Sequence, residues 1–159
     1  MTDSADDAKR YSLKLLSYRG RSESEMREKL GKKDFPEEVI SRTIKYLKQS
    51  GYLDDGALAV NLKRQAVEKK LLGYEGAWTF MLKRGLPPEA IRSTLDYDED
   101  GELENIHKLV DKKLKSMGNY LTESDKKRLW NFLARRGYSF EIIRKAIKET
   151  LKFREEAEG

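Results

Sequence analysis

The chain of 159 residues contains no cysteine and only one histidine, His107. Without cysteine it can form neither a disulfide bond, nor a zinc–thiolate site, nor a thiol nucleophile. Without a second histidine it lacks the ligands of the common transition-metal clusters. His107 lies between apolar residues of a predicted helix, which favours a surface or half-buried position over a catalytic one.

Motifs that bind phosphate or calcium are also missing. Lys83-Arg84-Gly85 lacks the spacing of a phosphate-binding glycine loop. Carboxylates alternate at Asp96, Asp98, Asp100 and Glu102. This run has no glutamate at the twelfth position of a calcium loop, where His107 stands instead. We therefore expect no catalytic residue, no metal site and no cofactor, so that the chain is not an enzyme.

Long apolar runs are absent as well. Apolar residues make up 38% of the chain and charged residues another 38%, and no run approaches the roughly 20 apolar residues that cross a bilayer. The first nine residues are polar and acidic, unlike a signal peptide. These features predict a cytoplasmic protein without a membrane partner.

Proline is scarce, with Pro36, Pro87 and Pro88 the only three, while lysine, glutamate, arginine and leucine are abundant. This composition favours helices throughout. One pattern occurs three times, starting at Leu30, Met81 and Leu133, so the copies are offset by 51 and then 52 residues. Three copies at nearly constant spacing indicate an internal repeat.

Each copy of the pattern predicts the same break between two helices. Gly85 and Gly137 can adopt the left-handed conformation that ends a helix, and Asp34 takes this place in the first copy as a weaker substitute. The following residue is expected to pack on the residue five positions earlier, as in a Schellman cap. The predicted pairs are Phe35 with Leu30, Leu86 with Met81, and Tyr138 with Leu133.

A short helix before each break and a longer helix before that complete each repeat. Ser22-Glu-Ser-Glu25 predicts a capping box at the start of the first short helix, and Asp54-Asp55 predicts the N-cap of the first long helix of the middle repeat. The expected apolar faces of the long helices are Tyr11, Leu15 and Tyr18, then Val60, Arg64 and Val67 with Ala59 and Ala66, then Ile106, Leu109, Val110 and Leu114. Trp78 and Trp130 hold equivalent positions, for which burial is the favoured interpretation.

The sequence therefore predicts an all-α fold of three tandem three-helix repeats in an elongated, curved array. The predicted segments are a flexible tail at 1–8, repeats at 9–54, 55–95 and 104–154, an acidic linker at 96–103, and a second flexible tail at 155–159.

Charge is unevenly distributed along the chain. Lys and Arg total 33 and Asp and Glu 28, a net charge of +5, and residues 56–95 hold 7 basic against 3 acidic residues, an excess of +4. Candidates for binding a polyanion lie in this segment: Lys63, Arg64, Lys69, Lys70, Tyr74, Lys83, Arg84 and Arg92. The pairs Lys32-Lys33, Lys83-Arg84 and Arg135-Arg136 each fall at a helix C-terminus, where cations complement the helix dipole. The first four candidates have no such role and are preferred.

Several of these segments resemble a known family. Arg21-Ser-Glu-Ser-Glu-Met-Arg-Glu-Lys-Leu30 followed by Gly51-Tyr-Leu-Asp-Asp55 resembles the opening of RecX regulatory proteins. Gly73-Tyr74 with Leu82-Lys-Arg-Gly-Leu86 resembles the middle segment of this family, and Arg136-Gly-Tyr138 resembles its third segment. The resemblance covers about residues 9–150 and implies tandem three-helix repeats.

The resemblance also implies a partner that composition and periodicity do not supply. It implies a monomer that docks on the filament of the RecA recombinase with single-stranded DNA and dampens its recombination, ATPase and coprotease activities. An autonomous nucleic-acid-binding module and a structural helical-repeat adaptor are the alternatives. Strongly salt-dependent binding to bare single strands would favour the module, and binding that needs RecA would favour the regulator.

Overall fold

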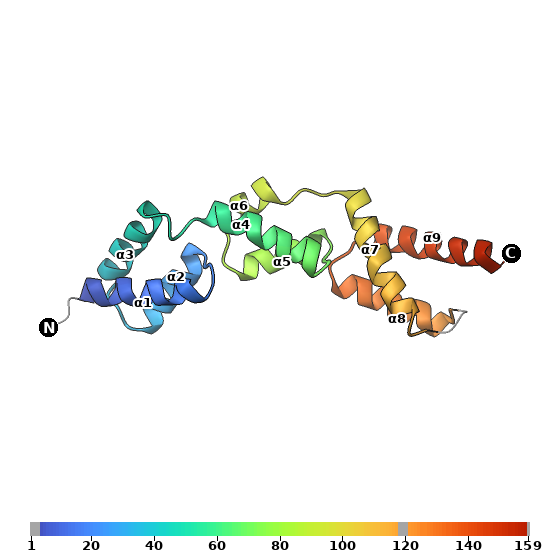
Figure 1. Ribbon diagram of the computed structural model, residues 1–159, viewed down its shortest axis with the longest axis horizontal. Helices are drawn as coiled ribbons and strands as arrows, with labels where there is room; N and C mark the ends of the chain where they lie inside the picture. The colour runs from blue at the N-terminus through green and yellow to red at the C-terminus, as the bar shows by residue number, and fades with distance from the viewer. Residues whose placement is uncertain (1–3, 118–120, 159) are drawn as a thin grey trace. The chain divides into compact units, whose positions relative to one another are not determined.

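The computed structural model describes residues 4–117 and 121–158, with side chains up to residue 150. These residues form nine α-helices and one π-helical turn, with no strand among them (Figure 1). The helices are α1 (Ser4–Tyr18), α2 (Glu23–Lys32), α3 (Glu37–Gln49), α4 (Asp55–Arg64), α5 (Tyr74–Lys83), α6 (Pro88–Thr94), α7 (Glu99–Leu114), α8 (Glu123–Arg135) and α9 (Phe140–Glu158), and the π-helical turn η1 is Gln65–Lys69. The predicted all-α fold with helical repeats is confirmed, while the elongated, curved arrangement stays a prediction. No described helix is both long and apolar enough to span a bilayer.

The chain folds into two compact units whose boundaries pass through the middle repeat. Unit 1 consists of the described residues of Met1–Leu62 with Met81–Thr94, and unit 2 of those of Lys63–Phe80 with Leu95–Gly159. Helices α4 and α5 each begin in one unit and end in the other. The repeat boundaries predicted from the sequence therefore do not coincide with those of the compact units.

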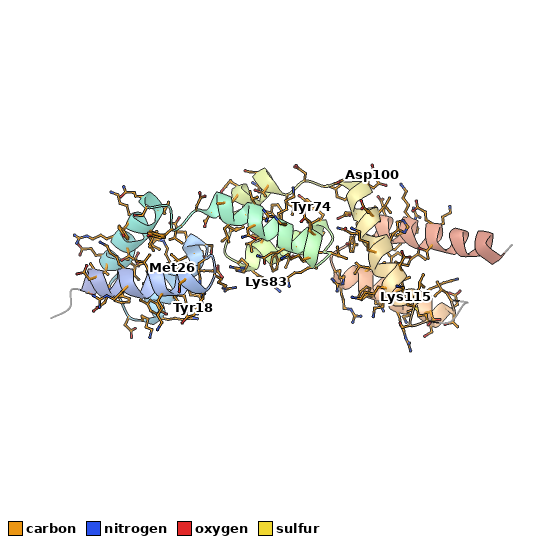
Figure 2. All side chains as sticks on the ribbon, viewed as in Figure 1. Tyr18, Met26, Tyr74, Lys83, Asp100 and Lys115 are labelled. Carbon is orange, nitrogen blue, oxygen red and sulfur yellow. The ribbon has the colours of Figure 1, made fainter. Side chains whose placement is uncertain are left out.

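The core of unit 1 lies among α1, α2 and α3. Its buried residues are Ala8, Met26, Leu30, Ile40, Ile44, Leu47 and Leu53. The predicted face of α1 is wrong at Tyr18 (labelled in Figure 2), which is 71% exposed. This helix buries Ala8 and Ser12 instead. Since α1 begins at Ser4, residues 4–8 of the predicted tail are helical, and residues 1–3 lie outside the described residues.

The core of unit 2 lies among α7, α8 and α9. Its buried residues are Ile106, Leu109, Val110, Leu129, Leu133, Tyr138, Ile142, Ile143 and Ala146, with Leu114 and Trp130 packed against them. This confirms the apolar face predicted for residues 106–114. Because α7 begins at Glu99 and α9 continues to Glu158, helices occupy most of the predicted acidic linker and of the predicted C-terminal tail.

The face predicted for the long helix of the middle repeat is confirmed at Ala59 and Ala66 and wrong at Val60 and Arg64. Ala59, Leu62 and Ala66 are fully buried, whereas Val60 is 53% exposed. The buried row through Ala59 and Ala66 and the exposed row through Val60 and Arg64 are neighbouring rows of the same helix. Periodicity alone does not distinguish two such rows.

The three predicted helix breaks are confirmed. The backbone angle φ is 60° at Asp34, 81° at Gly85 and 87° at Gly137, the left-handed conformation in each case. The amide of the next residue donates to the carbonyl five positions earlier at 3.3 Å: Phe35 to Leu30, Leu86 to Met81, and Tyr138 to Leu133. The capping box predicted at Ser22 is also present. The helix breaks and the capping box could be predicted from the sequence because each depends only on residues close together in the chain.

Candidate functional site

The predicted binding residues are divided between the two units. Lys63, Arg64, Lys69, Lys70 and Tyr74 belong to unit 2, and Lys83, Arg84 and Arg92 belong to unit 1. Arg64, Lys69, Lys70, Lys83 and Arg92 are exposed, whereas Lys63, Tyr74 and Arg84 are half-buried. Among the described residues, Arg84 is the only one of these candidates that forms an ion pair with a carboxylate.

Three of the exposed candidate cations, Arg64, Lys69 and Lys70, lie in or directly beside the π-helical turn. Here the amide of Lys70 donates to the carbonyl of Gln65 at 2.9 Å, five positions earlier. A turn of this width brings Arg64 and Lys69, five residues apart, closer to one side of the helix than an α-helix would. We call Arg64, Lys69 and Lys70 the basic segment. Its cations carry no carboxylate partner among the described residues and face solvent, as a polyanion site requires.

Lys63 and Tyr74 are less accessible than the basic segment. Lys63 lines a cavity of about 260 Å³ together with Tyr74, Asp98 and Glu102. The ring of Tyr74 lies 6.3 Å from that of Trp78 and 6.0 Å from that of Tyr97. Tyr74 is thus one member of an aromatic cluster, and the exposed ring of that cluster is Tyr97, at 54%.

Arg84 is a structural residue of unit 1. Its Nε donates to Glu25 Oε2 at 3.1 Å, and its Nη2 donates to the carbonyl of Gly20 at 2.9 Å. Only 15% of the side chain is exposed. Arg84 therefore attaches the end of α5 to the loop before α2, a role that neither the binding hypothesis nor the helix-dipole alternative included.

Arg136, at the equivalent position of the third repeat, does the same in unit 2. Its Nη1 donates to the carbonyl of Lys70, and its own carbonyl accepts the amide of Gly73 at 2.9 Å. Beside it, the hydroxyl of Tyr138 donates to the carbonyl of Leu71 at 2.7 Å. Leu71 has a φ of 52°, a rare left-handed conformation for a residue other than glycine. These hydrogen bonds hold it there.

Glycines allow the backbone segments held by Arg84 and by Arg136 to approach their neighbours closely. In unit 1, a Cβ at Gly85 would lie 2.6 Å from Ser22 Oγ. In unit 2, a Cβ at Gly73 or Gly76 would overlap the backbone of residues 136–138, and one at Gly137 would overlap the backbone of Gly76. We call residues 70–76 with 136–138 the unit 2 joint. The segments that resemble family motifs, Gly73-Tyr74 and Arg136-Gly-Tyr138, thus meet each other.

The paired aspartates have two different roles. Asp54 accepts the amide of Ala57 at 3.0 Å and caps α4, as predicted. The prediction is wrong for Asp55, whose Oδ1 accepts the amide of Glu23 at 3.0 Å, at the start of α2. Burial raises the pKa of the Asp55 carboxyl. Asp55 therefore links α4 to α2 within unit 1.

Glu102 does the equivalent in unit 2, although it lies in the predicted solvated linker. Its Oε1 accepts the amide of Tyr74 at 2.5 Å, at the start of α5. Its Oε2 is buried and has no hydrogen-bond partner among the described residues. Only 9% of the residue is exposed, and burial raises the pKa of its carboxyl, with Asp98 contributing in the same direction. A neutral side chain would fit this place at lower cost.

We expect the substitution Glu102→Gln to stabilise the fold at neutral pH. Because the folded state holds the proton of Glu102 more tightly than the unfolded chain, ionisation removes stability as the pH rises from the ordinary carboxyl pKa through the raised one. Glutamine keeps an acceptor for Tyr74 and does not ionise. Thermal unfolding at pH 7 should shift upward by roughly 2–4 °C, which corresponds to about 1 kcal/mol, and the shift should shrink towards pH 4.

The matched control is Glu104→Gln, on the exposed side of the same helix. It should leave the pH dependence of unfolding nearly unchanged. A Glu102→Gln protein less stable than the parent at pH 7 would contradict the expectation.

The fold and these joints define an all-helical protein built of tandem three-helix repeats. The family model described as "RecX, first three-helix domain" matches residues 8–47, and the one described as "RecX, third three-helix domain" matches residues 100–147. The regulatory protein RecX of Pelodictyon phaeoclathratiforme is 33% identical over 151 residues, covering 93% of this chain and 92% of that protein. The regulatory protein RecX of Clostridium botulinum is 29% identical over 147 residues, covering 89% and 68%. The chain belongs to the RecX family.

A solved structure has the same fold. The crystal structure of RecX from Lactobacillus salivarius matches with a TM-score of 0.80 and 22% sequence identity, covering 94% of this chain and 97% of that one. The similarity thus includes the middle repeat.

Proposed function

We propose that the chain regulates the RecA recombinase by binding its filament on single-stranded DNA and lowering its recombination, ATPase and coprotease activities. The observation that carries this proposal is membership of a family of regulatory proteins over nearly the whole chain. Such a regulator works in the cytoplasm, as a monomer, without a cofactor or catalysis of its own.

The basic segment, with Lys63 beside it, is the proposed filament-facing site. Arg64, Lys69 and Lys70 are exposed cations in the part of the chain with the largest positive excess. They can meet either DNA phosphates or acidic side chains of RecA. Lys83 and Arg92 of unit 1 are further exposed candidates, whereas Arg84 is engaged within its unit. Binding changes the filament only through a preference for one of its states.

Comparing two forms of the same oligonucleotide tests the proposal. We expect the chain to bind a single strand coated with RecA more tightly than the bare strand, measured by fluorescence anisotropy of a labelled chain. Equal affinity for the two, with strong salt dependence in both, would overturn the proposal. It would favour the autonomous nucleic-acid-binding module instead.

A further inference from the structure

The exposed large apolar side chains of unit 2 are aromatic. Among the described residues of this unit they are Tyr97, 54% exposed, and Phe140, 65% exposed. The ring of Phe140 lies 4.8 Å from that of Trp130 at an angle of 66°, and the ring of Tyr97 lies 6.0 Å from that of Tyr74 at 81°. Each exposed ring is thus supported by a half-buried ring through a tilted edge-to-face contact, which fixes its orientation.

A groove of about 610 Å³ adjoins the exposed ring of Tyr97. Tyr97 and Glu99 line it from the start of α7, and Glu141, Ile142, Arg144, Lys145 and Lys148 line it from α9. The charged residues of α9 are spaced three, four and seven positions after Glu141, which places them on one face of the helix. Phe140 lies four positions before Arg144 and is therefore its neighbour on that face.

The lining of the groove holds three cations and two carboxylates, a positive excess of one charge, and Asp96 and Asp98 adjoin Tyr97 in the sequence. Glu99 is paired with Lys145 at 2.7 Å, although Lys145 is still 52% exposed. Arg144 and Lys148 are exposed, and only Glu141 opposes them in the lining. Aliphatic side chains contribute little, since Ile142 is buried. An apolar helix or peptide would find no continuous apolar strip to cover here.

Aromatic rings beside exposed cations fit a ligand with flat π-faces and regularly spaced negative charges. We propose that this surface, which we call the α9 surface (Tyr97, Phe140, Arg144, Lys145 and Lys148), binds single-stranded nucleic acid directly. Bases stack on Phe140 and Tyr97, and the cations of α9 hold the phosphates. The inference rests on the proposed function for the presence of a single strand, and it adds a contact separate from the basic segment.

The chain has a built-in reporter for this contact. Trp78 and Trp130 are its only tryptophans, so a Trp78→Phe protein fluoresces from Trp130, beside Phe140. We expect oligothymidylate without RecA to quench this fluorescence to saturation. Phe140→Ala should weaken binding about tenfold, within the range for loss of one stacked base. Arg144→Glu with Lys148→Glu should lower the slope of log affinity against log salt by about 1.4, because two phosphate contacts are lost.

Unit 1 supplies the matched controls. Tyr18→Ala removes an exposed aromatic ring, and Lys14→Glu with Lys45→Glu makes the same change in charge at exposed positions. Both should bind oligothymidylate like the parent. Anisotropy of a labelled oligonucleotide with the otherwise wild-type chain gives the same affinities if Trp78→Phe perturbs folding.

Each of the following results would overturn the inference. One is parental affinity in both α9-surface variants. Another is no binding of bare oligothymidylate by the parent chain, which leaves the proposed regulation of RecA intact if the filament still responds. A loss seen only on RecA-coated DNA would likewise assign the surface to a protein contact and contradict a direct one.

Discussion

Adding a single methyl group at Gly137 should destabilise the protein by about 3 kcal/mol or more, a large effect for one substitution. Gly137 has a φ of 87°, and its Cβ would overlap the backbone of Gly76. The left-handed conformation alone costs an alanine about 1–2 kcal/mol. Relieving the overlap would also separate the two sides of the unit 2 joint and weaken the hydrogen bond from Gly73 to Arg136. Denaturant unfolding of Gly137→Ala measures the loss.

Gly51 provides the control, because it has a φ of 78° with open space around its missing Cβ. Gly51→Ala should therefore cost only the conformational part, about 1–2 kcal/mol. Asp34→Gly should act in the opposite direction, since glycine relieves the strain at a φ of 60°. Equal losses for Gly51→Ala and Gly137→Ala would mean that the joint is not closely packed.

Reversing the charge of the basic segment together with Lys63 should strongly reduce the effect on RecA. Changing Lys63, Arg64, Lys69 and Lys70 to glutamate lowers the net charge by 8, from +5 to −3. A site that faces phosphates or acidic side chains then becomes repulsive. We expect the concentration needed for half-inhibition of strand exchange to rise at least tenfold, with helical content unchanged by circular dichroism.

A variant with only two substitutions controls for an effect of the quadruple change on folding. Lys63 is half-buried, and the ammonium of Lys70 lies 5.4 Å from the ring of Phe80, whereas Arg64 and Lys69 are exposed. Arg64→Glu with Lys69→Glu should show the same direction of change. Lys112→Glu with Lys127→Glu, at exposed positions of α7 and α8, makes a matched change in charge and should inhibit like the parent. A folded quadruple variant with parental inhibition would refute the site.

Salt dependence distinguishes the two kinds of contact. If the basic segment touches phosphates, the charge-reversed protein should show a smaller salt slope, because each lost contact removes released counterions. If it meets acidic side chains of RecA, affinity for bare single strands should barely change while filament binding falls.

The parts of the fold that the sequence predicted correctly are the local ones. The break at Gly85 depends on hydrogen bonds within residues 81–86, and the capping box at Ser22 on residues three positions apart. The break could be predicted because a similar pattern occurs in three copies, and the capping box because Ser22 and Glu25 have its characteristic spacing. The rows of residues through Ala59 and through Val60 on the long helix of the middle repeat have the same periodicity. The apolar pattern therefore did not show which of the two rows is buried.

The candidate site was predicted less completely because its structural residues act over long separations. Arg84 reaches a carbonyl 64 positions away, and Glu102 accepts an amide 28 positions earlier. A basic residue at a helix end and a glutamate in an acidic run both have the composition of a solvated surface. Only the fold shows that they are engaged, while the exposed Arg64 and Lys69 remain available.

ATP hydrolysis by RecA from the same source, assembled on single-stranded DNA before the chain is added, tests the proposed regulation most directly. We predict that the rate falls as the chain is added and reaches a plateau at the concentration that saturates filament binding. An unchanged rate at saturation would contradict the proposed regulation of RecA.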